Sequence, residues 1–174
     1  NVNSQTLLGC SFNPELAYQW GLVEGNSCLW VERYDLWGSG LTLNRTPYNG
    51  RNYEYISEDP MLTNVIGREV IQGCSDKGII NGPKHMGFND QEINRSGVAV
   101  FMNEQKAREL ELRNLQQAFE GNGKPASFEG DATKDNTYTS GARGVMTSYN
   151  RHGAVAASAN VATMVNILQG EWGF

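Results

Sequence analysis

The apolar positions of this chain recur at helical spacing in four segments, and short apolar runs and polar loops separate those segments. The first helix is predicted from Pro14 to about Trp37, because Asn13 can cap it and a proline suits the first turn. Its apolar face comprises Leu16, Trp20 and Val23. The second helix is predicted to begin at Asp59-Pro60 and to end at Lys77-Gly78. Its apolar face comprises Leu62, Val65, Ile66 and Val70.

The third helix is predicted over residues 98–120 and the last one from about Asn160 to Gly170. The apolar positions of the third are Ala107, Leu110, Leu115 and Phe119, and those of the last are Val161, Met164, Val165 and Leu168. Two i,i+4 ion pairs are expected on the exposed side of the third helix, Glu104 with Arg108 and Glu109 with Arg113. Residues 121–141 contain almost no aliphatic side chains, so we expect a surface insertion there.

Short apolar runs at 41–43, 79–80 and 144–149 predict strands that alternate with the helices. Such alternation implies parallel strands joined by right-handed crossovers, in either an open doubly wound sheet or a (β/α)8 barrel. Gly38-Ser39-Gly40 lacks the remaining glycine of a dinucleotide-binding fingerprint and precedes a strand. Polar loops follow each strand, at 44–60, 84–97 and 149–159, which favours the barrel.

A complete barrel of this kind needs about 250 residues, and the chain has 174. We therefore predict the α/β class and an incomplete (β/α)8 barrel over residues 1–174, with about three to four βα units and parallel strands. The chain starts at Asn1 without a methionine and stops at Trp172-Gly173-Phe174 without a polar tail. We expect both ends to be cut.

Composition narrows the possible partners. Fourteen Lys and Arg residues stand against nineteen Asp and Glu, a net charge of -5 that argues against nucleic acid. The apolar runs are too short to span a membrane.

The cysteines, Cys10, Cys28 and Cys74, have no paired spacing and favour a reducing, cytoplasmic location. His85 and His152 have no ligand at i+3 or i+4, so we expect no metal and no other cofactor.

The loops after the strands hold the candidate chemistry, and several of their residues allow two interpretations. Arg45 and Arg51 either bind a ligand or pair with a glutamate inside their loop. Lys84 and His85 can both lean into one barrel mouth, and Tyr149 either binds a ligand or packs there. For Asp90 and Glu92 we favour orientation of neighbouring Lys or Arg side chains over acid/base work. Together the Arg, Lys, His, Asn and Tyr side chains suit a neutral polyol and point to a sugar.

Four motifs carry a resemblance to a known family. They are residues 45–60 (RTPYNGRNYEYISEDP), Lys84-His85 with residues 89–95 (NDQEINR), residues 145–150 (VMTSYN) and residues 171–174 (EWGF). In order and spacing they resemble glycoside hydrolase family 3, in its β-glucosidase branch, over essentially the whole chain apart from the insertion.

The resemblance implies an N-terminal (β/α)8 barrel followed by an α/β sandwich, and a retaining hydrolysis of terminal, non-reducing β-D-glucosyl residues. It implies that Arg51, Lys84, His85 and Arg95 grip the sugar hydroxyls, that Tyr149 lies near the nucleophile and that Met146 lines the same pocket. The expected partners are a β-linked glucoside or oligosaccharide, the remaining barrel segments and the C-terminal sandwich domain. No nucleic acid or membrane is expected.

Family 3 also implies catalytic groups that lie outside this chain. The nucleophilic aspartate is expected just after Phe174, the acid/base on the second domain, and a further sugar-binding aspartate before Asn1. The N-acetylglucosaminidase branch uses a histidine after the Lys-His pair, but residues 86–95 contain none. Retaining hydrolysis needs two carboxyl groups about 5 to 5.5 Å apart. Alone, the chain is therefore expected to be inactive.

Three classes of function remain open from the sequence. The leading one is a fragment of a β-glucosidase-like enzyme that holds part of the sugar-binding subsite. The second is a non-catalytic carbohydrate-binding module that uses the same loops. The third is a half-barrel that assembles with a second copy through its open strand edges.

Overall fold

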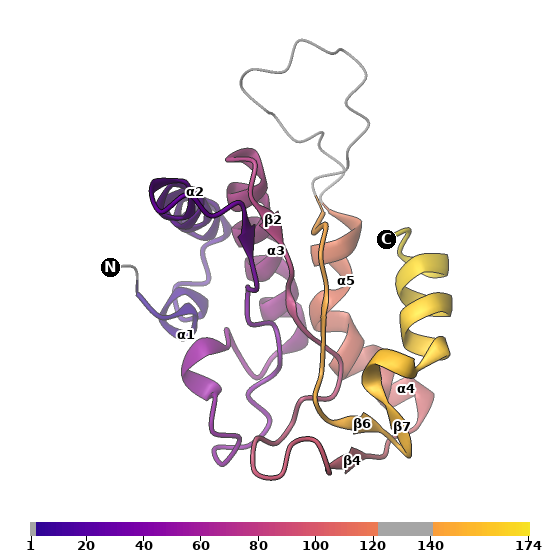
Figure 1. The fold of residues 1–174 in the computed structure, drawn as a ribbon. Helices are drawn as coiled ribbons and strands as arrows, with labels where there is room; N and C mark the ends of the chain where they lie inside the picture. The colour runs from indigo at the N-terminus through magenta and orange to yellow at the C-terminus, as the bar shows by residue number, and fades with distance from the viewer. Residues whose placement is uncertain (1–2, 122–140) are drawn as a thin grey trace.

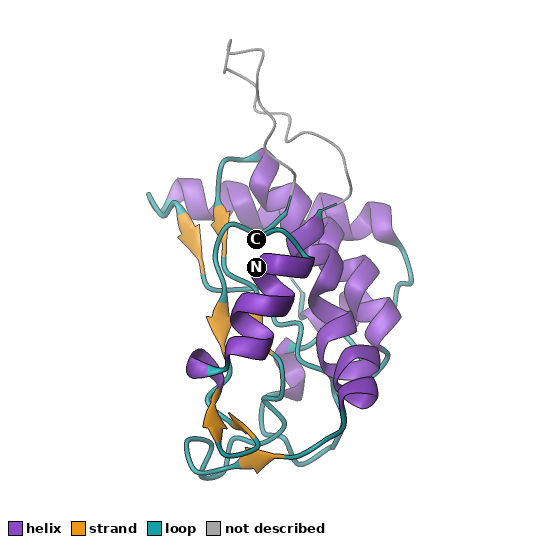
Figure 2. Cartoon of the chain, turned by 90° about the vertical axis from the view of Figure 1, so that its right-hand side faces the viewer, coloured by secondary structure: helices purple, strands orange, loops and turns teal. Residues whose placement is uncertain are grey.

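The computed structural model describes residues 3–121 and 141–174, so nearly all of the predicted insertion at 121–141 lies outside the described residues. Extended parallel segments form one layer and helices pack against it (Figures 1 and 2). The main helices are α1 (Gln5–Gly9), α2 (Pro14–Trp30), α3 (Pro60–Asp76), α4 (Glu104–Lys106), the π-helical η2 (Ala107–Leu112), α5 (Arg113–Glu120) and the π-helical η4 (Ala162–Glu171). Short 3-10 turns are η1 (Asn52–Glu54) and η3 (Ala157–Ala159).

Three extended stretches of the chain lie side by side in their sequence order and are hydrogen-bonded in parallel. Strand β1 (Asp35–Leu36) pairs with β2 (Ile80–Asn81), and β3 (Lys84–Met86) pairs with β5 (Met146–Thr147). Backbone bonds from Lys84 N to Ser39 O and from Leu41 N to Lys84 O, 3.0 and 2.6 Å long, continue the first pairing. The predicted α/β class with parallel strands is therefore confirmed.

The structure differs from the strand prediction in three details. Residues 41–43 are buried but leave the ladder after Leu41, because Asn44 N turns to bond with Ser57 O at 3.0 Å. Lys84 and His85, which we expected at the end of the second strand where its loop begins, form a separate strand, β3. A small sheet of β4 (Ala99–Val100), β6 (Arg151–His152) and β7 (Val155–Ala156) also contains one antiparallel pair, β6 with β7.

Helix α2 ends seven residues earlier than Trp37, the predicted end. Arg33 N bonds to Cys28 O at 2.9 Å while Glu32 takes φ 55°, which is the left-handed helix ending usually made by glycine. No glycine marks this end in the sequence, so the pattern gave no stop signal. Asn13 caps Leu16 N as predicted.

The contact face of α2 also differs from the prediction. Its buried positions are Ala17, Gly21 and Gly25, whereas Leu16 and Val23 are about half exposed. The reason is a close approach of α2 to α3, which only small residues permit. A side chain at Gly73 of α3 would place its Cβ 2.4 Å from Tyr18 O and 2.7 Å from Leu22 N.

Gly73→Ala is expected to lower the free energy of unfolding by about 2 kcal/mol or more, because overpacking a rigid contact outweighs the roughly 1 kcal/mol gained in helix propensity. Urea unfolding followed by circular dichroism measures this change. Gly170→Ala is the control, since the nearest atom to its Cβ lies 3.4 Å away. A Gly73→Ala chain as stable as the wild type would disprove the close packing of α2 on α3.

Helix α3 matches its prediction at both ends. Asp59 accepts a hydrogen bond from Leu62 N at 2.6 Å, and Gly78 takes φ 81° beyond the last turn. Ile66 and Val70 are buried as expected. A capping acid at the start and a glycine after the last turn were therefore enough to predict both ends of this helix.

The third predicted helix begins later than residue 98, because β4 occupies residues 99–100 and Asn103 caps Lys106 N at 2.8 Å. The ion pair between Glu104 and Arg108 forms at 2.9 Å as predicted. The predicted pair of Glu109 with Arg113 is wrong, since the Arg113 guanidinium donates to Gln116 Oε1 and Met61 Sδ.

The last helix, η4, buries Ile167 and Leu168, while Val161 and Val165 stay 61% and 47% exposed. Its i→i+5 bonding rotates the residues away from the 3.6-residue pattern on which the predicted face depended. The buried core between sheet and helices comprises Leu8, Leu41, Ile56, Ile66, Val70, Ile71, Met86, Leu112, Leu115, Phe119, Leu168 and Trp172. None of the helices in the described part of the chain has the length and apolar character needed to cross a bilayer.

Candidate functional site

Three loops at the carboxyl ends of the parallel segments bring the predicted site residues together. We call Arg51, Glu54, Lys84, His85, Glu92, Arg95 and Tyr149 the Arg51 cluster. Arg51 precedes η1, Lys84 and His85 belong to β3, and Arg95 follows β3. Met146 lies beside the cluster because its register in β5 places it opposite Lys84. Strands β3 and β5 and the loops of the same strand layer thus supply all six predicted residues.

Arg51 is the hub of the cluster. Its guanidinium contacts the Glu54 carboxylate, donates to His85 Nε2 at 3.1 Å and reaches Glu92 Oε1 at 3.3 Å. The second carboxylate oxygen of Glu54 lies 3.1 Å from Lys84 Nζ. The Arg/Glu pair anticipated inside this loop therefore exists, and it also fixes the position of Lys84.

Glu92 joins the remaining members to this hub. It accepts hydrogen bonds from Asn89 Nδ2 at 2.7 Å and from Arg95 at 2.9 Å. The Arg95 guanidinium in turn lies over the Tyr149 ring, 3.8 Å from its centroid, in a cation–π contact. The prediction that Glu92 orients neighbouring cations is confirmed, as is the same prediction for Asp90, which lies 2.8 Å from Arg45.

The protonation of His85 follows from its partners. The Arg51 guanidinium can only donate, so Nε2 must be the acceptor and the proton is assigned to Nδ1, 3.1 Å from Thr42 Oγ1. Burial, together with the positive charges of Arg51 and Lys84, lowers the pKa of His85 to about 3. The neutral imidazole therefore links Arg51 to Thr42, because each of its two nitrogens bonds to one of these residues.

Both carboxylates of the cluster are held ionised. Burial raises the pKa of Glu92, but hydrogen bonds from Asn89 and Arg95 and the charge of Arg51 outweigh it and lower the pKa below its usual range. For Glu54, burial is likewise outweighed by hydrogen bonds and charge from Arg51 and Lys84. Two carboxylates thus face three cations, Arg51, Lys84 and Arg95. The cluster therefore carries one excess positive charge and several aligned N–H donors.

The His85 ring is expected to stay neutral between pH 8 and pH 5, as its folded pKa of about 3 lies below the ordinary 6.5. Because the folded-state pKa is depressed, the stability that this group contributes is present above pH 6.5 and is lost as pH falls toward 3. Long-range nitrogen–proton NMR spectra of the two histidines measure both the titration and the tautomer. A His85 midpoint above pH 6, or a proton on Nε2, would contradict the assigned network.

Several members of the site were missing from the predicted set. Glu54, Asn89 and Thr42 hold Lys84, Glu92 and His85 respectively. The i,i+3 spacing of Glu54 from Arg51 was a usable signal, whereas Thr42 and Asn89 meet their partners only through the fold. A cavity of about 310 Å³ beside Lys84 and Glu54 is also lined by Trp37 and Tyr53. Among the described residues, no group of three or more potential metal ligands occurs.

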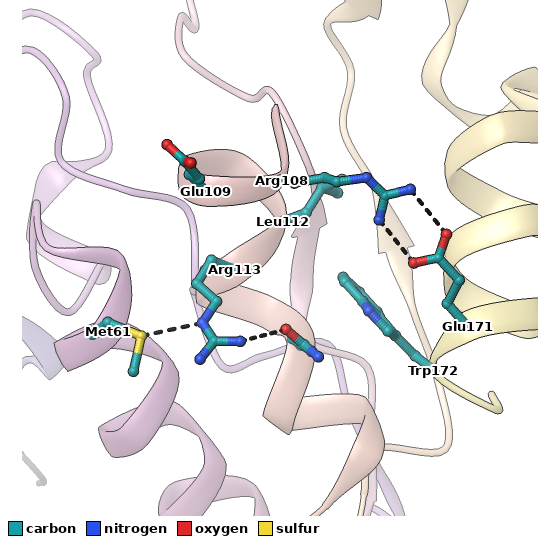
Figure 3. Close-up of a pocket in the computed structure, with 8 residues that line it drawn as sticks. Met61, Arg108, Glu109, Leu112, Arg113, Glu171 and Trp172 are labelled. Carbon is teal, nitrogen blue, oxygen red and sulfur yellow. Dashed lines mark hydrogen bonds and ion pairs between the residues drawn. The ribbon is translucent and has the colours of Figure 1, made fainter. Parts of the chain in front are cut away.

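A second hollow lies between helices α3, η2 and η4 and has a volume of about 490 Å³ (Figure 3). The Arg108 guanidinium makes two parallel bonds to Glu171, 2.7 and 2.9 Å long, across this hollow, and Trp172 lies beneath the pair. Arg113 and Met61 form its other side. It shares no lining residue with the Arg51 cluster, and its polar groups tie η4 to the neighbouring helices.

Comparison with known proteins gives the site its context. No protein-family model matches the chain. The β-glucosidase BoGH3A of Bacteroides ovatus is 32% identical over 169 residues, which are 97% of this chain and 20% of that protein. A crystal structure of a β-glucosidase from Paenibacillus barengoltzii matches with a TM-score of 0.86 and 32% identity, over 100% of this chain and 17% of its own.

A β-glucosidase 3B from Thermotoga neapolitana, solved with α-D-glucose, matches with a TM-score of 0.84 and 27% identity, over 99% of this chain and 22% of its own. Fold and relatives together define the class of protein, an α/β chain with parallel strands that resembles part of the related β-glucosidase structures. The chain belongs to glycoside hydrolase family 3, and the relatives named above are β-glucosidases. It spans about a fifth of the length of the curated relatives that it matches.

Proposed function

We propose that the chain supplies part of the glucose-binding subsite of a retaining β-glucosidase that hydrolyses terminal, non-reducing β-D-glucosyl residues. The observation that carries this proposal is the convergence of Arg51, Lys84, Arg95 and Tyr149 around two ionised carboxylates. Fixed charged donors suit sugar hydroxyls, and the related Thermotoga enzyme was solved with glucose. In this role the six residues Arg51, Lys84, His85, Arg95, Met146 and Tyr149 face the sugar or hold those that do.

The cluster favours catalysis through prepositioned donors. Lys84 is anchored to Glu54 by one contact, and an ammonium carries three N–H donors, so others remain for a hydroxyl. Arg51 is fixed by Glu54, His85 and Glu92 before any ligand arrives. Such contacts accelerate hydrolysis where they strengthen as the sugar ring flattens toward an oxocarbenium ion.

The remainder of the machinery is assigned to other parts of a longer protein. We propose that residues 1–174 are an incomplete (β/α)8 domain of about three to four βα units, that 121–141 form a surface insertion, and that the nucleophile and acid/base lie outside the chain. The chain spans about a fifth of its relatives, which supports this division. Alone, the chain is then inactive.

The test is hydrolysis of an aryl β-D-glucoside by the complete protein, with proton NMR of the first sugar released. We expect β-glucose as the initial product and no turnover of the matching aryl α-glucoside. Initial release of α-glucose, or no turnover of the β-glucoside, would defeat the proposal. Titrating the 174-residue chain alone with glucose separates the alternative of an independent binding module, which requires measurable binding without the rest of the protein.

A further inference from the structure

A second charged group adjoins the Arg51 cluster, and we call it the Arg45 triad: Arg45, Asp90 and Glu111. One nitrogen of Arg45, Nη1, lies 2.8 Å from Asp90 Oδ2 and 2.6 Å from Glu111 Oε1. Arg45 belongs to the loop that carries Arg51, Asp90 to the loop that carries Glu92 and Arg95, and Glu111 to η2. The triad therefore ties both loops of the sugar site to the helical layer.

Glu111 makes one further contact that neither of its partners makes. Its side chain is 1% exposed, and its Oε2 accepts a hydrogen bond from Phe88 N at 3.1 Å. Phe88 has φ 65° and Gly87 before it has φ 66°, so the chain leaves strand β3 through two left-handed residues. That conformation is unfavourable for a residue with a side chain and persists only where its surroundings hold it. The Glu111 carboxylate supplies such support.

The direction of this turn decides where the sugar-site residues of the loop lie. Asn89 comes immediately after Phe88, and its side chain both donates to Glu92 Oε1 at 2.7 Å and accepts from Tyr149 N at 3.2 Å. Glu92 then holds Arg51 and Arg95. A shift of the backbone at Phe88 would therefore displace Glu92 and, through it, Arg51 and Arg95. Lys84 would be affected least, because it is held by Glu54.

Burying a carboxylate at position 111 is energetically unfavourable, because the charged group loses its hydration. Burial raises the pKa of Glu111, the charge of Asp90 raises it further, and only Arg45 and the Phe88 amide oppose them. A leucine at this position, beside the buried Leu112 and Leu115, would be buried without the cost of desolvating a charge. A purely structural role in the core does not explain the carboxylate, whereas the hold on Phe88 N and Arg45 does.

We propose that Glu111 is a positioning residue of the sugar site, which sets the turn from β3 into residues 87–95 and thereby the placement of Glu92 and Arg95. This inference rests on the proposed function and adds to it a residue outside the sugar-facing set. Glu111 touches no substrate in this role; it acts through Phe88 and Arg45.

The test compares Glu111→Gln with Glu109→Gln in the complete protein. Both substitutions remove one negative charge from the same helix, but Glu109 is exposed and points away from the Arg108–Glu171 pair (Figure 3). Glutamine keeps the size of Glu111 but replaces one carboxylate oxygen by an NH2 group that can only donate, so it loses either the bond from Arg45 to Oε1 or the bond from Phe88 N to Oε2. We expect Glu111→Gln to raise amide hydrogen exchange in peptides covering 87–95 and to lower kcat/KM for an aryl β-glucoside by about 10- to 100-fold. Glu109→Gln should change neither.

Each outcome decides the proposal. Unchanged exchange over 87–95 overturns it, and so does raised exchange with unchanged kcat/KM, which would leave Glu111 a structural role only. Should Glu111→Gln fail to fold, Arg45→Lys replaces it, because a lysine keeps the charge but loses the planar guanidinium, and it should also raise exchange over 87–95. Wild-type protein without turnover would defeat the proposed function instead, and the exchange comparison would still decide whether Glu111 holds the turn.

Discussion

Replacing Lys84 by alanine is expected to lower kcat/KM for an aryl β-glucoside by about 100- to 1000-fold in the complete protein, the loss typical of one prepositioned donor. Lys84 is half-buried on strand β3 and anchored to Glu54 at 3.1 Å, so its ammonium is fixed before a sugar binds. Glu54 keeps Arg51 as a partner in the variant, so the fold should survive. Steady-state kinetics together with a thermal melt measure both effects.

Lys106→Ala is the matched control for Lys84, since Lys106 is an exposed residue of α4 and the charge change is the same. It should leave kcat/KM unchanged. If Lys84→Ala retained wild-type kinetics, Lys84 would not hold the sugar, and its ion pair with Glu54 would be the whole of its role.

Replacing Arg51 by lysine is expected to lower kcat/KM by about 10- to 150-fold, the equivalent of losing one hydrogen bond to a charged group, about 1.5 to 3 kcal/mol. The guanidinium serves Glu54, His85 and Glu92 at the same time, and an ammonium cannot span these three directions from one planar group. The net charge is preserved, so a loss of activity reports geometry instead of charge.

Arg33→Lys provides the control for Arg51, because Arg33 is exposed in the segment before β1. The same kinetic assay applies, and His85 NMR spectra add a direct view of the broken contact. An Arg51→Lys protein with normal kcat/KM and an unshifted His85 signal would show that the hub tolerates any cation, which contradicts the geometry described above.

The sequence allowed the fold to be predicted where local signals were complete. Asp59, Pro60 and Gly78 mark both ends of α3, and the structure has them there. Helix α2 was extended too far because its ending uses Glu32 in a left-handed conformation, where the pattern would need a glycine. The face of η4 was misplaced because π-helical bonding changes the spacing of buried residues.

The candidate site was predictable in the same uneven way. Arg51, Lys84, His85, Arg95, Met146 and Tyr149 lie in motifs that resemble a family, and the fold brings them to one edge of the strand layer. Glu111 gave no such signal, because a glutamate within a charged helix is usually a surface residue. Only the packing of η2 against the turn at Phe88 reveals that its carboxylate is buried.

The central claim is that glucose binds at the Arg51 cluster, and amide hydrogen exchange of the complete protein with and without saturating glucose tests it most directly. We predict slower exchange in peptides covering 49–54, 84–95 and 146–150, and no change in 162–171 of η4, which lines a hollow that shares no residue with the Arg51 cluster. Protection confined to other parts of the protein, with these three segments unaffected, would contradict the assignment of the sugar site.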